Sequence, residues 1–370
     1  MDGNKDDAYS EPGTMSDFTK YEYKTSSGPL VVLDSKLLKL CRSKAYSFDF
    51  DKITGRLSRW GLTESDIDDP QFCEVGPEIL DIEISTGGCP NACPWCYKGN
   101  TNAPPTNMAF ETFRTIIDRI PKVLGQIAFG ITGTKTNPDF LRMMEYAREC
   151  GIIPNFTLSG IDLDDDMAEK CSRLVGALAV SAYQTDKNVC YNAVKKFVDL
   201  GLKQVNIHLL AALETFEFCQ EVLQDRLTDT RLQGMNAIVM LGLKPRGRAM
   251  QNFSPLPFDK YEKLIDFCTE NKIAYGADSC SCPKIEKWAE IHDAKELLPL
   301  LERCESMLFS LYISVNGIAW PCSFSEGEEK GISVLDHDFN DVWNGEIANE
   351  WRKKLLGNKR ECPVYECLKI

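Results

Sequence analysis

The sequence contains no run of about eighteen apolar residues, the length that a helix needs to cross a membrane. Residues 1–30 are polar and lack the apolar segment of a signal peptide. Positive charge is not in excess, because the net charge is −13 at pH 7. Proteins that hold nucleic acid through its phosphates need a basic surface. We therefore expect a cytoplasmic protein that neither spans a membrane nor binds nucleic acid directly.

Cysteine, by contrast, is abundant, with sixteen among 370 residues. In a reducing compartment, clustered cysteines more often bind metal or act in catalysis than form disulfides. Isolated cysteines often pack as small apolar side chains. We assign no functional role to six isolated ones, which are Cys41, Cys150, Cys171, Cys190, Cys219 and Cys268.

From residue 79 onward, short β-branched runs alternate with longer amphipathic runs. Strands are predicted over 79–85, 126–131, 153–158, 177–183, 204–210 and 236–243. Helices are predicted over 109–120, 137–150, 164–174, 188–200, 214–226 and 257–270. Upstream, 1–20 is a polar lead-in, and 46–60 has the alternation and the Thr-Gly turn of a hairpin. Six βα units in series predict a parallel sheet, because each crossover carries a helix.

Several predicted strands have one apolar and one polar face. In one strand, Gln204, Asn206 and His208 oppose Val205, Ile207 and Leu209; in the first strand, Asp81, Glu83 and Ser85 oppose Leu80, Ile82 and Ile84. The apolar rows must face the helices, so the polar rows face inward. A closed eight-stranded barrel fills its interior with apolar side chains. An antiparallel sheet with one wet face is the alternative, but the intervening helices disfavour it. The predicted fold is therefore α/β, a partial (β/α)6 barrel of the TIM type with a polar lumen.

A loop of cysteines follows the first predicted strand directly. It reads Thr86-Gly-Gly-Cys89-Pro-Asn-Ala-Cys93-Pro-Trp-Cys96, with the spacing C-x3-C-x2-C. Three thiolates can hold three corners of a cubane cluster. Structural zinc needs four ligands, and no fourth Cys or His is nearby. The loop therefore indicates a [4Fe–4S] cluster with one iron open to a small molecule.

This loop resembles that of the radical S-adenosylmethionine (radical SAM) enzymes, whose signature is C-x3-C-x-aromatic-C, with Trp95 as the aromatic. The resemblance covers roughly residues 79–270. It implies that the open iron binds the methionine moiety of S-adenosylmethionine and that an electron from the cluster releases a 5′-deoxyadenosyl radical, which abstracts hydrogen from the substrate. It also implies a reducing partner such as flavodoxin or ferredoxin.

Other family positions carry over one by one. Where the family has a Gly-Gly-Glu-like stretch, this chain reads Phe129-Gly130-Ile-Thr132-Gly-Thr and lacks the acid. The resemblance leaves a backbone contact with the cofactor to Gly130 and Thr132. It places ribose and carboxylate contacts at Ser181, Asn206 and His208; satisfied polar groups inside the barrel are the alternative, and His208 could also exchange protons.

Cysteines return at the C-terminal end of the chain, at 280, 282, 304, 322, 362 and 367. Cys304, Gly317 and Cys322 match the opening of the SPASM extension of radical SAM enzymes, with a hairpin turning on Asn316-Gly317. Full SPASM domains carry more cysteines, so the resemblance implies the shorter Twitch type with one auxiliary [4Fe–4S] cluster. Its expected ligands are Cys304, Cys322, Cys362 and Cys280, with Cys282 and Cys367 as reserves for the fourth place; zinc is the alternative metal.

Three segments follow from these patterns: an N-terminal lead-in and hairpin over 1–78, the partial barrel over 79–272, and a small cysteine-rich hairpin and helix extension over 273–370. The expected function is that of a radical SAM enzyme acting on a peptide or protein. A radical SAM enzyme for a small metabolite or a nucleotide-derived substrate is one alternative; an iron–sulfur electron carrier or a zinc module is another. Lys244-Pro-Arg246-Gly-Arg248 follows the sixth strand, where its arginines clamp a carboxylate or form a solvated loop.

Overall fold

A five-stranded antiparallel sheet forms the N-terminal part of the computed structural model, which describes residues 17–61 and 71–365. Its strands pair in chain order: β1 (Thr19–Thr25), β2 (Gly28–Asp34), β3 (Leu38–Arg42), β4 (Ser47–Asp51) and β5 (Leu57–Trp60). The predicted hairpin over 46–60 is confirmed as β4 and β5, and Gly55 at its turn has a φ of +73°, which favours glycine. Residues 1–16 of the predicted lead-in lie outside the described residues.

The second sheet contains the predicted βα series. Its seven consecutive parallel strands, in spatial order, are β6 (Ile79–Glu83), β9 (Gln126–Gly130), β10 (Ile153–Leu158), β11 (Leu178–Ser181), β12 (Val205–Ala211), β13 (Ala237–Gly242) and β14 (Tyr275–Ala277). The first six confirm the predicted strands, although β6 ends two residues earlier than predicted. Ser85 and Thr86 form β7 (Ser85–Thr86), which pairs with β8 (Thr106–Asn107). Sequence patterns missed β14 because three residues are too few to show a period.

All six predicted helices are present and connect these strands: α1 (Phe110–Arg119), α2 (Phe140–Glu149), α3 (Asp165–Leu174), α4 (Lys187–Asp199), α5 (Phe216–Thr228) and α7 (Phe258–Glu270). Short elements interrupt the later connections, namely η2 (Leu213–Thr215), η3 (Thr230–Leu232) and α6 (Ala249–Asn252). Asp164 starts α3 by accepting a hydrogen bond from the Met167 amide at 2.8 Å, a standard N-cap. In the part of the chain that the structure describes, no helix is both long and apolar enough to cross a membrane.

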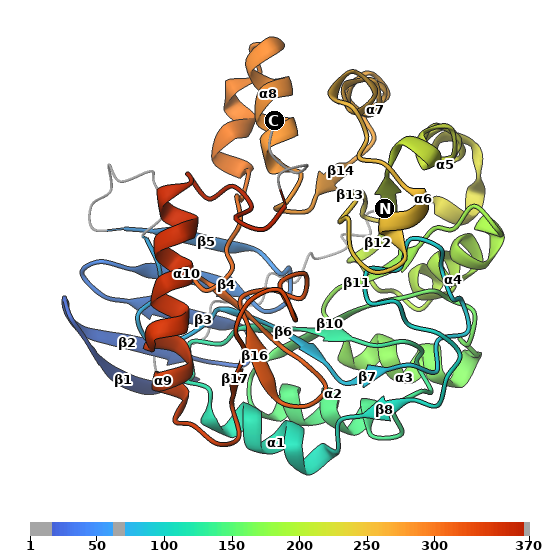
Figure 1. Cartoon of the computed structure of the whole chain (residues 1–370). Helices are drawn as coiled ribbons and strands as arrows, with labels where there is room; N and C mark the ends of the chain where they lie inside the picture. Colours follow the sequence, from blue (N-terminus) through green and yellow to red (C-terminus); the bar gives the residue numbers. More distant parts are fainter. Residues whose placement is uncertain (1–16, 62–70, 366–370) are drawn as a thin grey trace, which may run out of the picture.

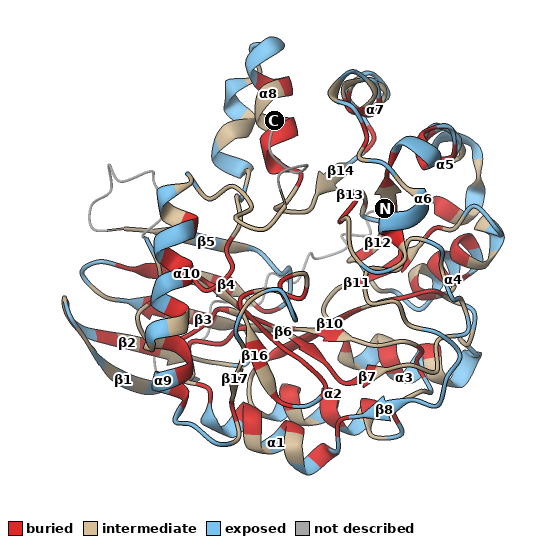
Figure 2. Ribbon diagram, viewed as in Figure 1, coloured by how far each residue is buried: buried red, intermediate tan, exposed pale blue. Residues whose placement is uncertain are grey.

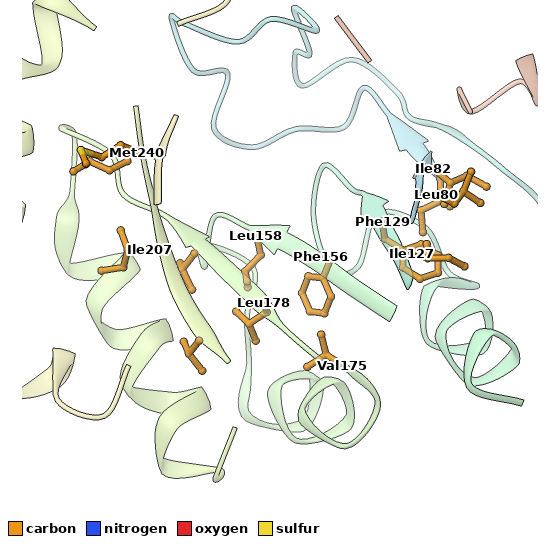
Figure 3. Close-up of a cluster of buried hydrophobic side chains, with 14 of the residues drawn as sticks. Leu80, Ile82, Ile127, Phe129, Phe156, Leu158, Val175, Leu178, Ile207 and Met240 are labelled. Carbon is orange, nitrogen blue, oxygen red and sulfur yellow. The ribbon is translucent and has the colours of Figure 1, made fainter. Parts of the chain in front are cut away.

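The main core lies between the parallel strands and these helices (Figure 3). Side chains of Leu80, Ile82 and Ile207 are fully buried there, which confirms that the apolar faces of their strands point to the helices. Figure 2 shows the same arrangement as buried strands and helices with exposed outer faces. The polar residues between them must therefore point to the concave side, because side chains alternate along a strand.

The predicted hairpin at Asn316-Gly317 is confirmed as β15 (Ser310–Ile313) and β16 (Ile318–Trp320), and Gly317 has a φ of +73°. The sequence did not reveal where this hairpin attaches. β15 pairs parallel with β6, and β17 (Ile332–Ser333) pairs with β16, so the hairpin extends the large sheet beyond its first strand. The order of that sheet runs from β14 to β17 as a mixed α/β structure. The other C-terminal elements are α8 (Cys282–Ile291), η4 (Lys295–Leu300), α9 (Phe339–Asn344) and α10 (Glu346–Gly357).

The N-terminal sheet packs against the ends of the parallel strands at which those strands begin (Figure 1). Phe48 and Phe50 of β4 share a core cluster with Val123, just before β9, and with Ile153, the first residue of β10. The buried Lys39 ammonium donates to the carbonyl oxygen of Lys122 at 2.8 Å. This sheet therefore covers the N-terminal ends of the parallel strands and leaves their C-terminal ends for a site.

Candidate active site

A cavity of about 840 Å³ lies on the concave side of the parallel sheet. All three thiols of the predicted cluster loop, Cys89, Cys93 and Cys96, line it. Their loop follows β7, at the C-terminal end of the parallel strands, where barrel enzymes place their active sites. Two hydrogen bonds shape the loop, from the Cys89 amide to the Thr101 carbonyl at 2.9 Å and from the Cys96 amide to the Cys93 carbonyl at 3.1 Å.

Aromatic side chains pack against this loop. Trp95 stacks on Tyr183 with ring centroids 5.7 Å apart, and it meets Phe253 edge-on at 5.5 Å. The Tyr183 hydroxyl hydrogen-bonds to the Cys93 thiol. Burial raises the pKa of Cys93 to about 11, so its thiolate form needs a positive partner such as iron. Cys93 is thus a thiol that a bound metal centre would ionise.

Four more thiols line the same cavity: Cys280, Cys304, Cys322 and Cys362. Burial raises the pKa of Cys322 to about 12, with a further contribution from the neighbouring Cys304. Burial also raises the pKa of Cys280 and of Cys304; Cys304 and Cys322 add to the shift at Cys280, and Cys362 adds to that at Cys304. Successive members of this set lie 18 to 40 positions apart in the sequence, and the fold places all of them on one cavity.

The two reserve cysteines have different outcomes. Cys282 is buried as the first residue of α8, contacts the Glu286 carboxylate at 3.7 Å, and does not line the cavity. Cys367 lies outside the described residues. Within residues 17–61 and 71–365, no three His, Cys, Asp or Glu side chains converge closely enough to hold a single metal ion. A cubane cluster offers a separate iron to each thiolate, and the two groups of thiols that line the cavity fit that donor set.

The remaining predicted site residues also line the cavity: Trp95, Gly130, Thr132, Ser181, Asn206 and His208. They are spread along its depth. The Thr132 amide donates to the Ser85 hydroxyl at 3.2 Å, beside the loop. Asn206 is the second residue of β12 and accepts a hydrogen bond from the Asn236 side chain at 2.9 Å. Because strands rise about 3.3 Å per residue, Asn206 lies deep in the cavity and far from the C-terminal end of β12. Its predicted cofactor contact stays a prediction.

His208 lies further along the same strand, with its Nδ1 atom 3.4 Å from the Thr157 hydroxyl. Burial lowers its pKa to about 4; Asp278 opposes this shift and Lys244 reinforces it. The imidazole is therefore neutral at neutral pH. That state suits hydrogen bonding better than proton donation.

A charged cluster beside the loop went unnoticed in the sequence. The Lys98 ammonium lies 3.2 Å from the Glu83 carboxylate, 2.5 Å from the Tyr312 hydroxyl, and against Glu326. Next to it, burial raises the pKa of Asp81 to about 7, with Lys98 opposing the shift. The inward polar face of the first strand already pointed to Asp81 and Glu83. No sequence signal linked Lys98 to Tyr312, because 214 positions separate them.

An apolar wall also borders the loop. Trp95, Leu210 and Phe253 pack on a small core of Ala212, Leu243 and Ala249. Leu210 and Leu243 line the cavity as Trp95 does. The wall thus offers an aromatic and aliphatic surface beside the three thiols, on which a flat ring could stack.

Solved structures share this architecture, although no family model and no curated protein sequence matches the chain. SuiB of Streptococcus suis, solved alone and bound to S-adenosylmethionine, aligns over 75% of this chain and 68% of its own, at 14% identity and a TM-score of 0.58. AnSMEcpe with bound AdoMet and Cp18Cys peptide aligns over 74% of this chain and 82% of its own, at 16% identity and a TM-score of 0.56. Both are radical SAM enzymes of the SPASM type. The chain has the radical SAM fold.

Proposed function

We propose that this protein is a radical SAM enzyme that cleaves S-adenosylmethionine reductively on a [4Fe–4S] cluster bound by Cys89, Cys93 and Cys96. The observation that carries the proposal is that these three thiols line one cavity at the C-terminal end of the parallel strands. When bound, the cluster would supply the electron that splits the sulfonium of S-adenosylmethionine, leaving a 5′-deoxyadenosyl radical to abstract hydrogen. The protein contributes placement and shielding around that chemistry.

The residues around the loop have distinct parts in this proposal. Trp95, Leu210 and Leu243 line the cavity and offer an apolar surface for the adenine ring. Gly130 and Thr132 line the cavity beside the loop and would meet the methionine moiety through their backbone. The N-terminal sheet covers the far end of the barrel, and this arrangement excludes water from one side of the cavity.

Cys280, Cys304, Cys322 and Cys362 would hold one auxiliary [4Fe–4S] cluster. The position of these four thiols supports this assignment, since they line the same cavity as Cys89, Cys93 and Cys96. Cys280 takes the fourth place in this proposal because Cys282 lies away from the cavity. Iron–sulfur ligands must stay reduced to bind, so we place the protein in a reducing compartment such as the cytoplasm, with a flavodoxin or ferredoxin as reductant.

A peptide or protein is the proposed substrate. SuiB has been solved bound to precursor peptide SuiA, and anSMEcpe with Cp18Cys and Kp18Cys peptides. The cavity also reaches from the cysteine loop to the auxiliary cysteines, so a side chain entering it would lie between the two. A small metabolite or nucleotide-derived substrate is the second candidate within the same class.

The test is anaerobic reconstitution with iron and sulfide, followed by incubation with S-adenosylmethionine and dithionite. Mass spectrometry should detect 5′-deoxyadenosine with the wild type and with Cys150→Ala, a control whose thiol lies outside the cavity. The triple variant Cys89→Ala, Cys93→Ala, Cys96→Ala should form none, while its circular dichroism spectrum stays unchanged. Cleavage at the wild-type rate in the triple variant would refute the proposal. A wild type that binds stoichiometric zinc, or that holds iron but never cleaves the cofactor, would favour a zinc module or an electron carrier.

A further inference from the structure

One arginine, which does not line the cavity, donates several hydrogen bonds to the backbone of the loop that carries the three cysteines. Arg248 donates from Nε to the Cys93 carbonyl at 2.9 Å, from Nη1 to the Gly99 carbonyl at 2.9 Å, and from Nη2 to the Asn100 carbonyl at 2.8 Å. Its backbone amide donates to the Cys96 carbonyl at 3.1 Å. Guanidinium is suited to this task because its donors are fixed in one plane. A single residue thus fixes the backbone at both ends of the Cys93–Asn100 stretch.

Gly247 lets the two segments approach this closely. A Cβ atom at position 247 would lie 2.4 Å from the Tyr97 carbonyl oxygen and 2.5 Å from that of Cys96. Both neighbours are backbone atoms, so neither can move aside cheaply. Its φ of +59° also falls in the left-handed region that favours glycine. Position 247 therefore needs glycine on two separate grounds.

The neighbouring arginine reaches the other group of cysteines. Arg246 donates from Nη1 to the Ser323 carbonyl at 2.9 Å and from Nη2 to the Glu326 carbonyl. Ser323 directly follows Cys322. At the start of the same segment, the buried Lys244 ammonium pairs with Asp278, two residues before Cys280. Residues 244–248 therefore contact the backbone or neighbours of both cysteine groups.

We propose that residues 244–248 are a positioning bracket that sets how the two cysteine groups sit relative to each other, an inference that rests on the proposed function. Arg246 and Arg248 flank Gly247, which packs directly against the backbone of Cys96 and Tyr97, so a shift of one cysteine group would displace the segment that holds the other. Neither arginine lines the cavity, and the side chains of both donate hydrogen bonds to backbone carbonyl oxygens. The clamp on a carboxylate that the sequence suggested is therefore not what these side chains form.

A matched control exists elsewhere in the chain. Arg119 also donates to backbone carbonyls, those of Val334 and Leu335 at 2.6 Å each and that of His337 at 3.5 Å. It lies at the end of α1 and does not line the cavity. Arg119→Ala therefore removes a comparable set of hydrogen bonds without touching either cysteine group. An effect seen with Arg248→Ala but not with Arg119→Ala is therefore caused by the loss of hydrogen bonds to the cysteine loop and not by the loss of an arginine in general.

The test uses the full chain, reconstituted anaerobically, as wild type, Arg248→Ala, Arg248→Lys, Arg246→Ala and Arg119→Ala. Iron content should fall from about eight per chain toward about four in Arg248→Ala, because the auxiliary cluster remains, and should stay near eight in Arg119→Ala. Arg248→Lys should give an intermediate iron content, since one ammonium cannot reach three carbonyls. This conservative variant also keeps the test possible if Arg248→Ala does not fold.

Electron paramagnetic resonance supplies the readouts independent of turnover. Adding S-adenosylmethionine should change the spectrum of the reduced wild type and of Arg119→Ala, and the change should be weaker in Arg248→Lys. In Arg246→Ala, both clusters should load but their magnetic interaction should differ from that of the wild type. The bracket proposal would be overturned, and the proposed function left standing, if all variants at Arg246 and Arg248 matched the wild type in three measurements. These are the iron content, the spectral response to S-adenosylmethionine and the magnetic interaction between the clusters. A wild type without clusters, or without any response to S-adenosylmethionine, would instead overturn the proposed function.

Discussion

Arg59 and Glu78 form a bidentate ion pair that joins the N-terminal sheet to the start of the parallel sheet. Arg59 Nε lies 2.8 Å from Glu78 Oε1, and Nη2 lies 2.7 Å from Oε2; the side chains are 2% and 0% exposed. The hydroxyl of Tyr46 also donates to Glu78, and Arg59 reaches the Glu305 carboxylate at 2.9 Å. Glu305 follows Cys304 directly, so the network runs from β5 to the segment that contains Cys304.

This network gives a prediction about stability. Glu78→Gln should destabilise the protein by about 3–5 kcal/mol, because it leaves the Arg59 guanidinium buried without its full counter-charge. Asp166→Asn breaks the exposed Lys170–Asp166 pair and should cost less than about 1 kcal/mol. Urea unfolding followed by circular dichroism measures both. Similar losses in the two variants would mean that the buried pair does not hold the N-terminal sheet to the parallel sheet.

The fourth ligand of the auxiliary cluster can be decided by paired variants. Cys280→Ala should lower the iron content of the reconstituted protein from about eight toward about four per chain, because three thiolates hold the auxiliary cluster weakly. Cys282→Ala removes a buried thiol two residues away and should leave iron near eight, with a small loss of stability. Iron analysis with sulfide determination distinguishes them. If Cys282→Ala loses the iron instead, the fourth place belongs to Cys282.

Tyr183 should tune the cluster on the first cysteine loop. Its hydroxyl hydrogen-bonds to Cys93, and hydrogen bonds to cluster sulfurs help set the reduction potential. Tyr183→Phe removes a bond worth about 1 kcal/mol, so the potential should become more negative by about 40 mV for one electron. A redox titration followed by electron paramagnetic resonance measures this shift. Tyr275→Phe, outside the cavity, should leave the potential unchanged.

His208 should make the stability of the cluster-free protein depend on pH. Its folded-state pKa of about 4 lies below the ordinary value of 6.5, so under acid conditions the unfolded chain binds a proton that the folded chain does not. This contribution to stability is present above pH 6.5 and is lost as the pH falls toward 4. Between pH 7 and pH 5 the wild type should lose about 2 kcal/mol more than His208→Gln, as measured by urea unfolding at each pH. Parallel pH profiles for the two proteins would show that water in the lumen solvates the imidazole.

The order of strands and helices could be predicted from local patterns. The strand at 153–158 matches β10 residue for residue, because its apolar and polar side chains alternate between two environments. The same alternation placed Asn206 and His208 on the cavity side and Ile207 in the core. Two features could not be predicted from local patterns. Strand β14 has only three residues, and the pairing of β15 with β6 joins positions about 230 apart in the chain.

By itself the sequence determined the cysteine loop, because C-x3-C-x2-C with Trp95 is a local arrangement that a short stretch of chain can form. It also determined the βα series, since each strand and helix reports its own buried face through its period. Only the tertiary structure decided that Cys280 rather than Cys282 faces the cavity, that Lys98 meets Tyr312, and that Arg246 and Arg248 hold two distant loops. These contacts depend on which sheet edge receives the hairpin and how the chain closes around it. Such long-range packing leaves no period and no fixed spacing in the sequence.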